Sequence, residues 1–124
     1  MTRRSLRIAL ATLFLLVTTS LYSQKLNFFP PRGFFQEPFE LTITAPVENE
    51  IIKYTLNGKD PLTASGAMSG PSPLTLTVDP DNFTNRDRAP AVCVRAIAVA
   101  GDTVASNLNT HTYVFVDKIN ENSL

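Results

Sequence analysis

Residues 39–44 read FELTIT, a stretch in which apolar and polar side chains alternate. This period is typical of a β-strand, whose successive side chains point to opposite faces of the sheet. The same period recurs in four further runs: 52–56, 74–78, 94–98 and 112–115. Shorter strands are expected around 26–29 and 103–105. Because no run has the period of an amphipathic helix, the sequence predicts an all-β domain.

Residues that favour turns separate the predicted strands. They are PPRG at 30–33, Ala45-Pro46, Asn57-Gly58, Asp60-Pro61, Gly70-Pro71 and AGD at 100–102. Several short strands without helices imply an immunoglobulin/fibronectin type III-like antiparallel β-sandwich. The chain has no Trp and one Cys, which excludes the disulfide and tryptophan core of antibody domains. The predicted core includes Phe39, Leu41, Ile43, Tyr54, Leu56, Leu76, Val94, Ala96, Tyr113 and Phe115.

Residues 1–23 are expected to be a signal peptide that is removed on export. Three arginines stand within the first seven residues, and a short apolar run at 8–17 and several small residues follow. The apolar run is shorter than the roughly 20 residues of a membrane span, although a short anchor or a buried first helix is the alternative. Cleavage is expected after Ser23, or else after Ser20. The mature chain is therefore expected to be secreted, or to lie at the cell surface or in the periplasm.

Charge and cysteine content narrow the function classes. Beyond residue 23 the chain has eight Lys and Arg against 11 Asp and Glu, hence a net charge of −3. Nucleic-acid binding calls for a clustered basic surface, so no nucleic-acid partner is expected. Cys93 is the only cysteine, so the chain cannot form a disulfide within itself. Its apolar neighbours predict a buried, inert thiol, with pairing between chains or a nucleophilic role as the alternatives.

No pattern in the sequence predicts catalysis or metal binding. His111 is the only histidine, and it is expected on the outward face of a strand with no nucleophile or metal ligand beside it. Residues 79–82, DPDN, could offer oxygens to calcium, but the EF-hand pattern is missing and these residues are common in turns. We therefore predict no catalytic, metal-binding or cofactor-binding residue, no cofactor and no enzymatic activity.

Aromatic side chains are the candidates for contact with a ligand or partner. Phe34 and Phe35 are expected to close one end of the core, with partner contact as the alternative. Phe83 lies in the polar stretch 79–91, DPDNFTNRDRAPA, and is expected to be the most exposed phenylalanine. Loops of this length are often mobile or functional. An exposed aromatic ring can stack on a sugar or anchor a protein partner, so Phe83, Phe34 and Phe35 are the candidate contact residues.

Four motifs occur in a characteristic order. They are PRGFF at 31–35, IKYTLNG at 52–58, VRAIA at 94–98 and THTYVF at 110–115. Together they resemble the chitobiase/β-hexosaminidase C-terminal domain, a fibronectin type III-like module, over roughly 28–116. Such modules also occur near the N-terminus of exported bacterial proteins that resemble CotH-type kinases, an arrangement that fits a leading signal peptide. Asn57 and Lys59 stand where the family usually has Asp and Ser, and the loop at 79–91 is longer than in many relatives.

The resemblance implies a domain plan and a function. Residues 24–116 are expected to form one sandwich module, and 117–124 a tail or the start of a linker. Such a module would be a non-catalytic accessory or spacer that orients or docks a neighbouring domain. The alternative is an independent binding module for a glycan or a cell-surface protein. The family's catalytic residues belong to neighbouring domains, so none transfers to this chain, and no membrane span is expected in the mature chain.

Overall fold

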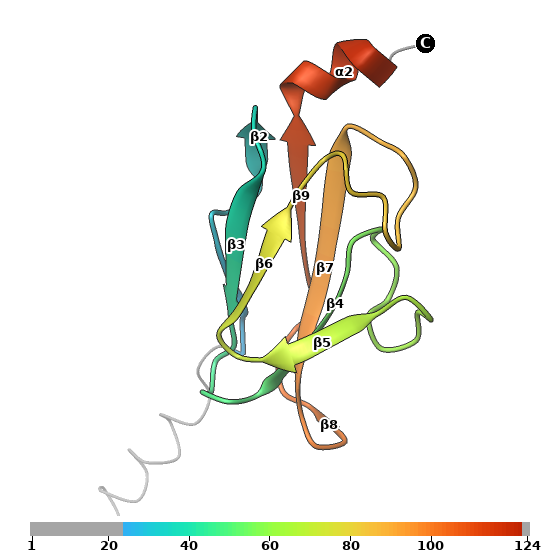
Figure 1. The fold of residues 1–124 in the computed structure, drawn as a ribbon. Helices are drawn as coiled ribbons and strands as arrows, with labels where there is room; N and C mark the ends of the chain where they lie inside the picture. Colours follow the sequence, from blue (N-terminus) through green and yellow to red (C-terminus); the bar gives the residue numbers. More distant parts are fainter. Residues whose placement is uncertain (1–23, 123–124) are drawn as a thin grey trace, which may run out of the picture.

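The computed structural model describes residues 24–122, and the predicted signal peptide at 1–23 lies outside these residues (Figure 1). Nine strands and one short helix follow in chain order. They are β1 (Asn27–Phe29), β2 (Gly33–Phe35), β3 (Phe39–Thr44), β4 (Ile51–Thr55), β5 (Met68–Pro71), β6 (Leu74–Val78), β7 (Ala91–Ala100), β8 (Thr103–Val104), β9 (Asn109–Phe115) and α2 (Val116–Asn122). Within the described part of the chain, no helix has the length and apolar character needed to cross a membrane.

The strands form two sheets that pack face to face (Figure 1). One sheet has the order β1-β3-β6, and the other has the order β2-β9-β7-β4-β5, with β8 paired to β7. Between β1 and β2 the chain crosses from one sheet to the other at Pro30-Pro31, where proline cannot donate to a strand ladder. The pairing of β2 with β9 is parallel and the other strand pairs are antiparallel. The predicted all-β sandwich is confirmed.

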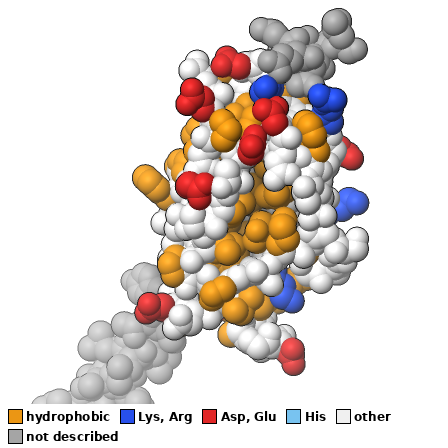
Figure 2. Space-filling model, viewed as in Figure 1, with side chains coloured by type: hydrophobic (Ala, Val, Ile, Leu, Met, Phe, Trp, Pro, Cys, Tyr) orange, Lys and Arg blue, Asp and Glu red, His pale blue; other side chains and the backbone are white. Residues whose placement is uncertain are grey.

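The core lies between the two sheets and is built from alternate side chains of the long strands. Six predicted core residues are buried, namely Leu41, Ile43, Val94, Ala96, Tyr113 and Phe115. The other four, Phe39, Tyr54, Leu56 and Leu76, are half-buried and pack against this core. Both β5 and β6 are edge strands, so the sandwich is open between them, and apolar side chains reach the surface along this opening (Figure 2).

The structure contains elements that the sequence did not predict. The strands β2 and β5 were expected to be turn or loop, and the expected tail begins with α2. Cys93 is only half-buried, because on β7 its side chain points to the outer face of the sheet, away from the core. Its thiol is free. His111 shares a face of β9 with the buried Tyr113, so its expected outward orientation is wrong.

Candidate functional site

Two loops of the sandwich lie close together and define the candidate site (Figure 1). One loop, at 56–67, joins β4 to β5, and the other, at 79–90, joins β6 to β7. Between them is an open groove of ≈ 410 Å³, whose lining includes Asn57, Lys59, Ser65, Phe83, Asn85 and Asp87. We call it the loop groove. It contains Phe83, one of the three aromatic residues predicted to contact a ligand.

Arg86 organises the 79–90 loop. Its guanidinium donates hydrogen bonds to six backbone carbonyls, those of Pro80 (2.8 Å), Asn82 (2.9 Å), Ala89 (3.2 Å), Asp87 (3.3 Å), Ala91 (3.3 Å) and Asp79 (3.4 Å). A planar fork of five N–H donors suits this arrangement, in which the loop wraps around one cation. Burial lowers the pKa of Arg86, and the nearby carboxylates of Asp79 and Asp81 oppose that shift. The loop thus has a defined structure without a strand or helix of its own.

The acidic and amide side chains of this loop form turns. The Asp79 carboxylate accepts a hydrogen bond from the amide of Asp81 (2.9 Å), and the Asn82 side chain accepts one from the amide of Thr84 (3.0 Å). This is the usual turn chemistry of Asp and Asn. Over residues 24–122, no group of three or more His, Cys, Asp or Glu is placed to hold a metal ion. The carboxylate of Asp81 instead lies 3.2 Å from Lys118 of α2.

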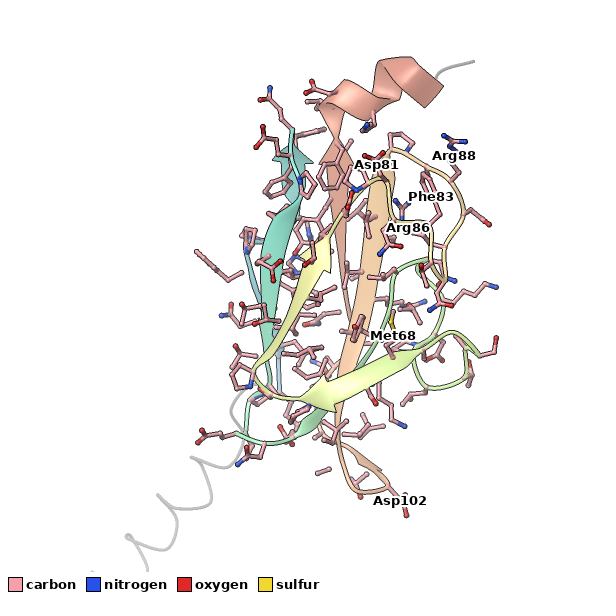
Figure 3. All side chains as sticks on the ribbon, viewed as in Figure 1. Met68, Asp81, Phe83, Arg86, Arg88 and Asp102 are labelled. Carbon is pink, nitrogen blue, oxygen red and sulfur yellow. The ribbon has the colours of Figure 1, made fainter. Side chains whose placement is uncertain are left out.

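Phe83 is held between the loop's cations. Its side chain is 38% exposed, and the guanidinium carbons of Arg86 and Arg88 each lie 5.2 Å from the ring centroid (Figure 3). A cation placed over an aromatic face is attracted by the ring quadrupole. Phe83 was expected to be the most exposed phenylalanine, but this is wrong, because Phe34 and Phe29 are more exposed. The two guanidinium groups also limit the ring face that a sugar could use for stacking.

The structure does not bring the three candidate aromatics together. Phe35 points into the core and stacks on Phe39 with ring centroids 4.2 Å apart, as expected. Phe34 is 77% exposed, so its predicted role in closing the core is wrong. Neighbouring residues of a strand face opposite ways, so only one phenylalanine of this pair can face the core. Phe29 is 71% exposed, and the same alternation around the buried Phe28 would have identified it.

The other wall of the loop groove is fixed to the outer face of the larger sheet. Gly58 has φ +75°, which confirms the predicted turn at Asn57-Gly58. Its carbonyl accepts a hydrogen bond from the Arg95 guanidinium (3.1 Å), and its amide donates to the Cys93 carbonyl (3.2 Å). The Thr55 hydroxyl donates to the carbonyl of Lys59 (2.6 Å). Both walls are therefore held by hydrogen bonds to backbone carbonyls, most of them donated by side chains.

His111 lies away from the loop groove, in the wall between β1 and β9. Its ring stacks on Phe28 with a centroid distance of 4.1 Å, and its Nδ1 accepts a hydrogen bond from the amide of Arg32 (2.9 Å). Burial lowers the pKa of His111, and the positive charges of Arg32 and Lys25 act in the same direction. His111 is therefore packed between Phe28 and the Arg32 backbone, which is a structural role.

The described polar and aromatic side chains of the loop groove are two cations, two amides, one hydroxyl, one carboxylate (Asp87) and one aromatic ring, which are groups that can bind or position a ligand. Arg86 is the organising residue that the sequence did not reveal, since nothing in DPDNFTNRDRAPA separates it from Arg88. Comparison of the chain with models of protein families, with curated proteins and with solved structures found no match.

Proposed function

We propose that this chain is a non-catalytic accessory module of an exported bacterial protein, in which it orients or docks a neighbouring domain. The observation that carries the proposal is the way the chain leaves the sandwich. Strand β9 ends at Phe115 and α2 begins at Val116, so no flexible linker separates them. A helix that directly continues a core strand is suited to hold a neighbouring domain in a fixed orientation relative to the sandwich.

The direction of the chain supports a spacer. The described chain begins near the end of β3, where Asn27 pairs with Thr44, and α2 lies at the opposite pole (Figure 1). With the predicted signal peptide removed, the mature chain would start at one pole, and a domain after α2 would lie at the other, about the length of the module away. At about 3.3 Å per residue, a ten-residue strand such as β7 corresponds to roughly 30 Å.

Backbone contacts hold the base of α2. The amide of Phe115, the last residue of β9, donates to the carbonyl of Pro90 at the end of the Arg86-organised loop (2.8 Å). Lys118 and Asp81 form an ion pair across the same junction, with exposed fractions of 26% and 65%. Exposed ion pairs contribute about 0–1 kcal/mol, so the backbone bond and the Arg86-organised loop are the main support.

The resemblance to the chitobiase/β-hexosaminidase C-terminal domain supports the same proposal, because that domain is an accessory module. The IKYTLNG motif covers most of β4 and its turn, and VRAIA lies within β7. The Arg95 guanidinium of VRAIA donates a hydrogen bond to the Gly58 carbonyl of IKYTLNG. In this chain the motif residues have folding roles, as expected of a module whose family keeps its catalytic residues elsewhere.

The proposal is tested by measuring how firmly the exit direction is held. A reporter domain is fused after Leu124, and spin labels are placed on the reporter and at Val104, an exposed residue of β8. Cys93 is replaced by serine, since its thiol is free. Pulsed electron resonance should give a narrow distance distribution that broadens with Arg86→Ala and stays narrow with Arg88→Ala. A distribution equally broad in all three proteins would refute the proposal.

The loop groove favours a second candidate function, the binding of a neutral glycan. It combines amide and hydroxyl side chains with the partly exposed Phe83. Calorimetric titration with chitin, cellulose and xylan oligomers tests this candidate. Micromolar affinity that disappears in Phe83→Ala would favour the binding module over the spacer. Because Arg86 and Arg88 both lie over the ring, we expect no affinity tighter than about millimolar.

A further inference from the structure

Among the strands of residues 24–122, β6 has the longest unprotected edge. Edge strands expose unpaired backbone N–H and C=O groups, and proteins usually protect them by keeping them short or by placing proline or charge there. The other edges follow this rule, since β1 and β2 have three residues each, β8 has two, and β5 ends in Gly70-Pro71. Strand β6 has five residues, LTLTV, without proline, glycine or charge. Within the described residues its backbone pairs with β3 alone, so its other edge is free.

The free edge of β6 is held in place at both ends. Before its start, the buried Ser72 donates its amide to the carbonyl of Glu50 (2.8 Å), and its hydroxyl accepts a hydrogen bond from the amide of Ala45 (2.8 Å). After its end, the Arg86 guanidinium donates to the carbonyl of Pro80 (2.8 Å). A partner strand therefore meets an edge that is already ordered, which lowers the entropic cost of pairing.

Apolar side chains lie beside this edge, where the sandwich is open (Figure 2). At the start of β6 the opening is closed, because Leu74 lies so near β5 that a Cβ on Gly70 would be 2.7 Å from its Cδ1 atom. Further along, Leu76 is half-buried and packs against the core. The half-buried Tyr54 and Met68 are paired across β4 and β5, so they share the inner face of the larger sheet (Figure 3). A strand paired with β6 would help to cover these side chains.

We propose that β6 pairs antiparallel with β6 of a second copy of this chain, so that the two smaller sheets form one continuous sheet. Pro73 and Pro80 flank the strand and cannot donate a backbone hydrogen bond, which limits the pairing to 74–78. Full overlap of this segment places Leu76 opposite the partner's Leu76, and Thr75 opposite the partner's Thr77. A two-fold axis at Leu76 then relates the two copies.

This register is chemically self-complementary. Directly opposite residues of paired strands lie on the same face, so leucine meets leucine on the inner face and threonine meets threonine on the outer face. A shift by one residue would turn the apolar face of one copy to solvent. On the outer face Thr75 is hydrogen-bonded to Thr42, and Thr77 donates to Glu40, within the same subunit. The charge of Glu40 thus faces threonine, and no like charges are opposed.

The same two-fold axis brings together the open sides of the two sandwiches. Each copy then covers the half-buried apolar side chains beside β6 of the other. A strand from another protein would have to bring the same alternation of apolar and uncharged polar residues, which β6 of a second copy supplies. Because five paired residues make a small interface, we expect a weak, reversible dimer.

The test is sedimentation equilibrium of the purified protein after removal of the predicted signal peptide, in reducing buffer so that Cys93 cannot cross-link two copies. We expect a dimer with a dissociation constant of about 10 μM to 1 mM, and concentration-dependent shifts of the amide resonances of 74–78. A protein that is still monomeric at about 1 mM would overturn the proposal. So would a dimer whose 74–78 resonances do not move, because its contact would lie elsewhere.

Charge variants locate the contact. The double variant Thr75→Lys, Thr77→Lys places like charges opposite each other across the pair, and we expect it to weaken the dimer about tenfold or more. The double variant Thr110→Lys, Thr112→Lys is the matched control, because both threonines are exposed on β9 and the added charge is the same. Circular dichroism verifies that both variants are folded. Equal weakening by the two double variants would show that β6 is not the contact.

Cysteine pairs test the register, in a chain that carries Cys93→Ser. One protein carries Thr75→Cys and another carries Thr77→Cys, and the two are mixed and oxidised. We expect the mixed disulfide to exceed both disulfides between identical copies, because only positions 75 and 77 lie opposite each other. Equal yields of the three products would contradict the antiparallel register. None of these measurements depends on the direction in which α2 leaves the sandwich.

Discussion

Replacing Arg86 by alanine removes the cation around which the 79–90 loop is built. Its two shortest hydrogen bonds, 2.8 Å to Pro80 and 2.9 Å to Asn82, are charge-assisted. Hydrogen bonds to charged groups contribute about 1.5–3 kcal/mol each. The other four, at 3.2–3.4 Å, are longer and weaker. Because carbonyls freed in a surface loop can turn to water, we expect Arg86→Ala to lower the free energy of unfolding by about 2–3 kcal/mol, below the sum of the bonds.

Arg88 provides the matched control, because its guanidinium lies at the same distance from Phe83 as that of Arg86. Within the described residues it makes no hydrogen bond, and an exposed cation–π contact contributes about 0.5–1 kcal/mol. We therefore expect Arg88→Ala to lose no more than about 1 kcal/mol. Arg86→Lys keeps the charge without the planar fork and should recover less than half of the loss. Urea unfolding followed by circular dichroism measures all three, and equal losses for both alanine variants would refute the role of Arg86.

Three further predictions concern the sandwich itself. Phe35→Ala should lower the free energy of unfolding by about 3–5 kcal/mol, whereas Phe34→Ala, at the exposed neighbouring position, should change it by less than about 0.5 kcal/mol in the same urea assay. Gly58→Ala should lower stability more than Gly101→Ala. Both glycines have positive φ, which costs an alanine about 1–2 kcal/mol, but only at Gly58 would the new Cβ lie 3.1 Å from the Cys93 sulfur. Equal thermal midpoints for the two variants would contradict this. Burial raises the pKa of Tyr113, so the unfolded chain loses the phenolic proton at a lower pH than the folded chain. The contribution of this group to stability should be fully present below about pH 10 and should be lost as the pH rises above it. In Tyr113→Phe the free energy of unfolding should fall less steeply over the same pH range.

The sequence predicted those strands in which buried apolar and exposed polar side chains alternate. In β3, a shift by one residue would expose Leu41 and Ile43, so the pattern FELTIT specifies both strand and face. The strands β2 and β5 carry no such pattern. Gly33–Phe35 becomes a strand because it pairs with β9, and Met68–Pro71 because it pairs with β4. Such edge strands form by pairing with strands that are distant in the sequence, and local sequence propensity does not indicate that pairing.

The helix α2 and the candidate site were harder to predict for related reasons. Seven residues are too few to form a stable helix alone, so α2 depends on its attachment to β9. Phe83 was predicted from its polar loop to be the most exposed phenylalanine, but Phe34 and Phe29 are more exposed. The sequence could not show that two guanidinium groups lie against the Phe83 ring. The role of Arg86 depends on six carbonyls that only the folded loop brings together. Likewise, the hydrogen bond from the Arg32 amide to His111 joins residues that are 79 positions apart in the sequence.

An orienting module requires that the sandwich fix the direction in which the chain leaves it. Residual dipolar couplings of the backbone amides in the purified protein measure this direction. We expect the couplings of α2 to fit the same alignment tensor as those of β7 and β9, with the helix in the orientation of Figure 1. If α2 moves independently, its couplings will fall towards zero or require a separate tensor, and that result would contradict the proposed role as an orienting module.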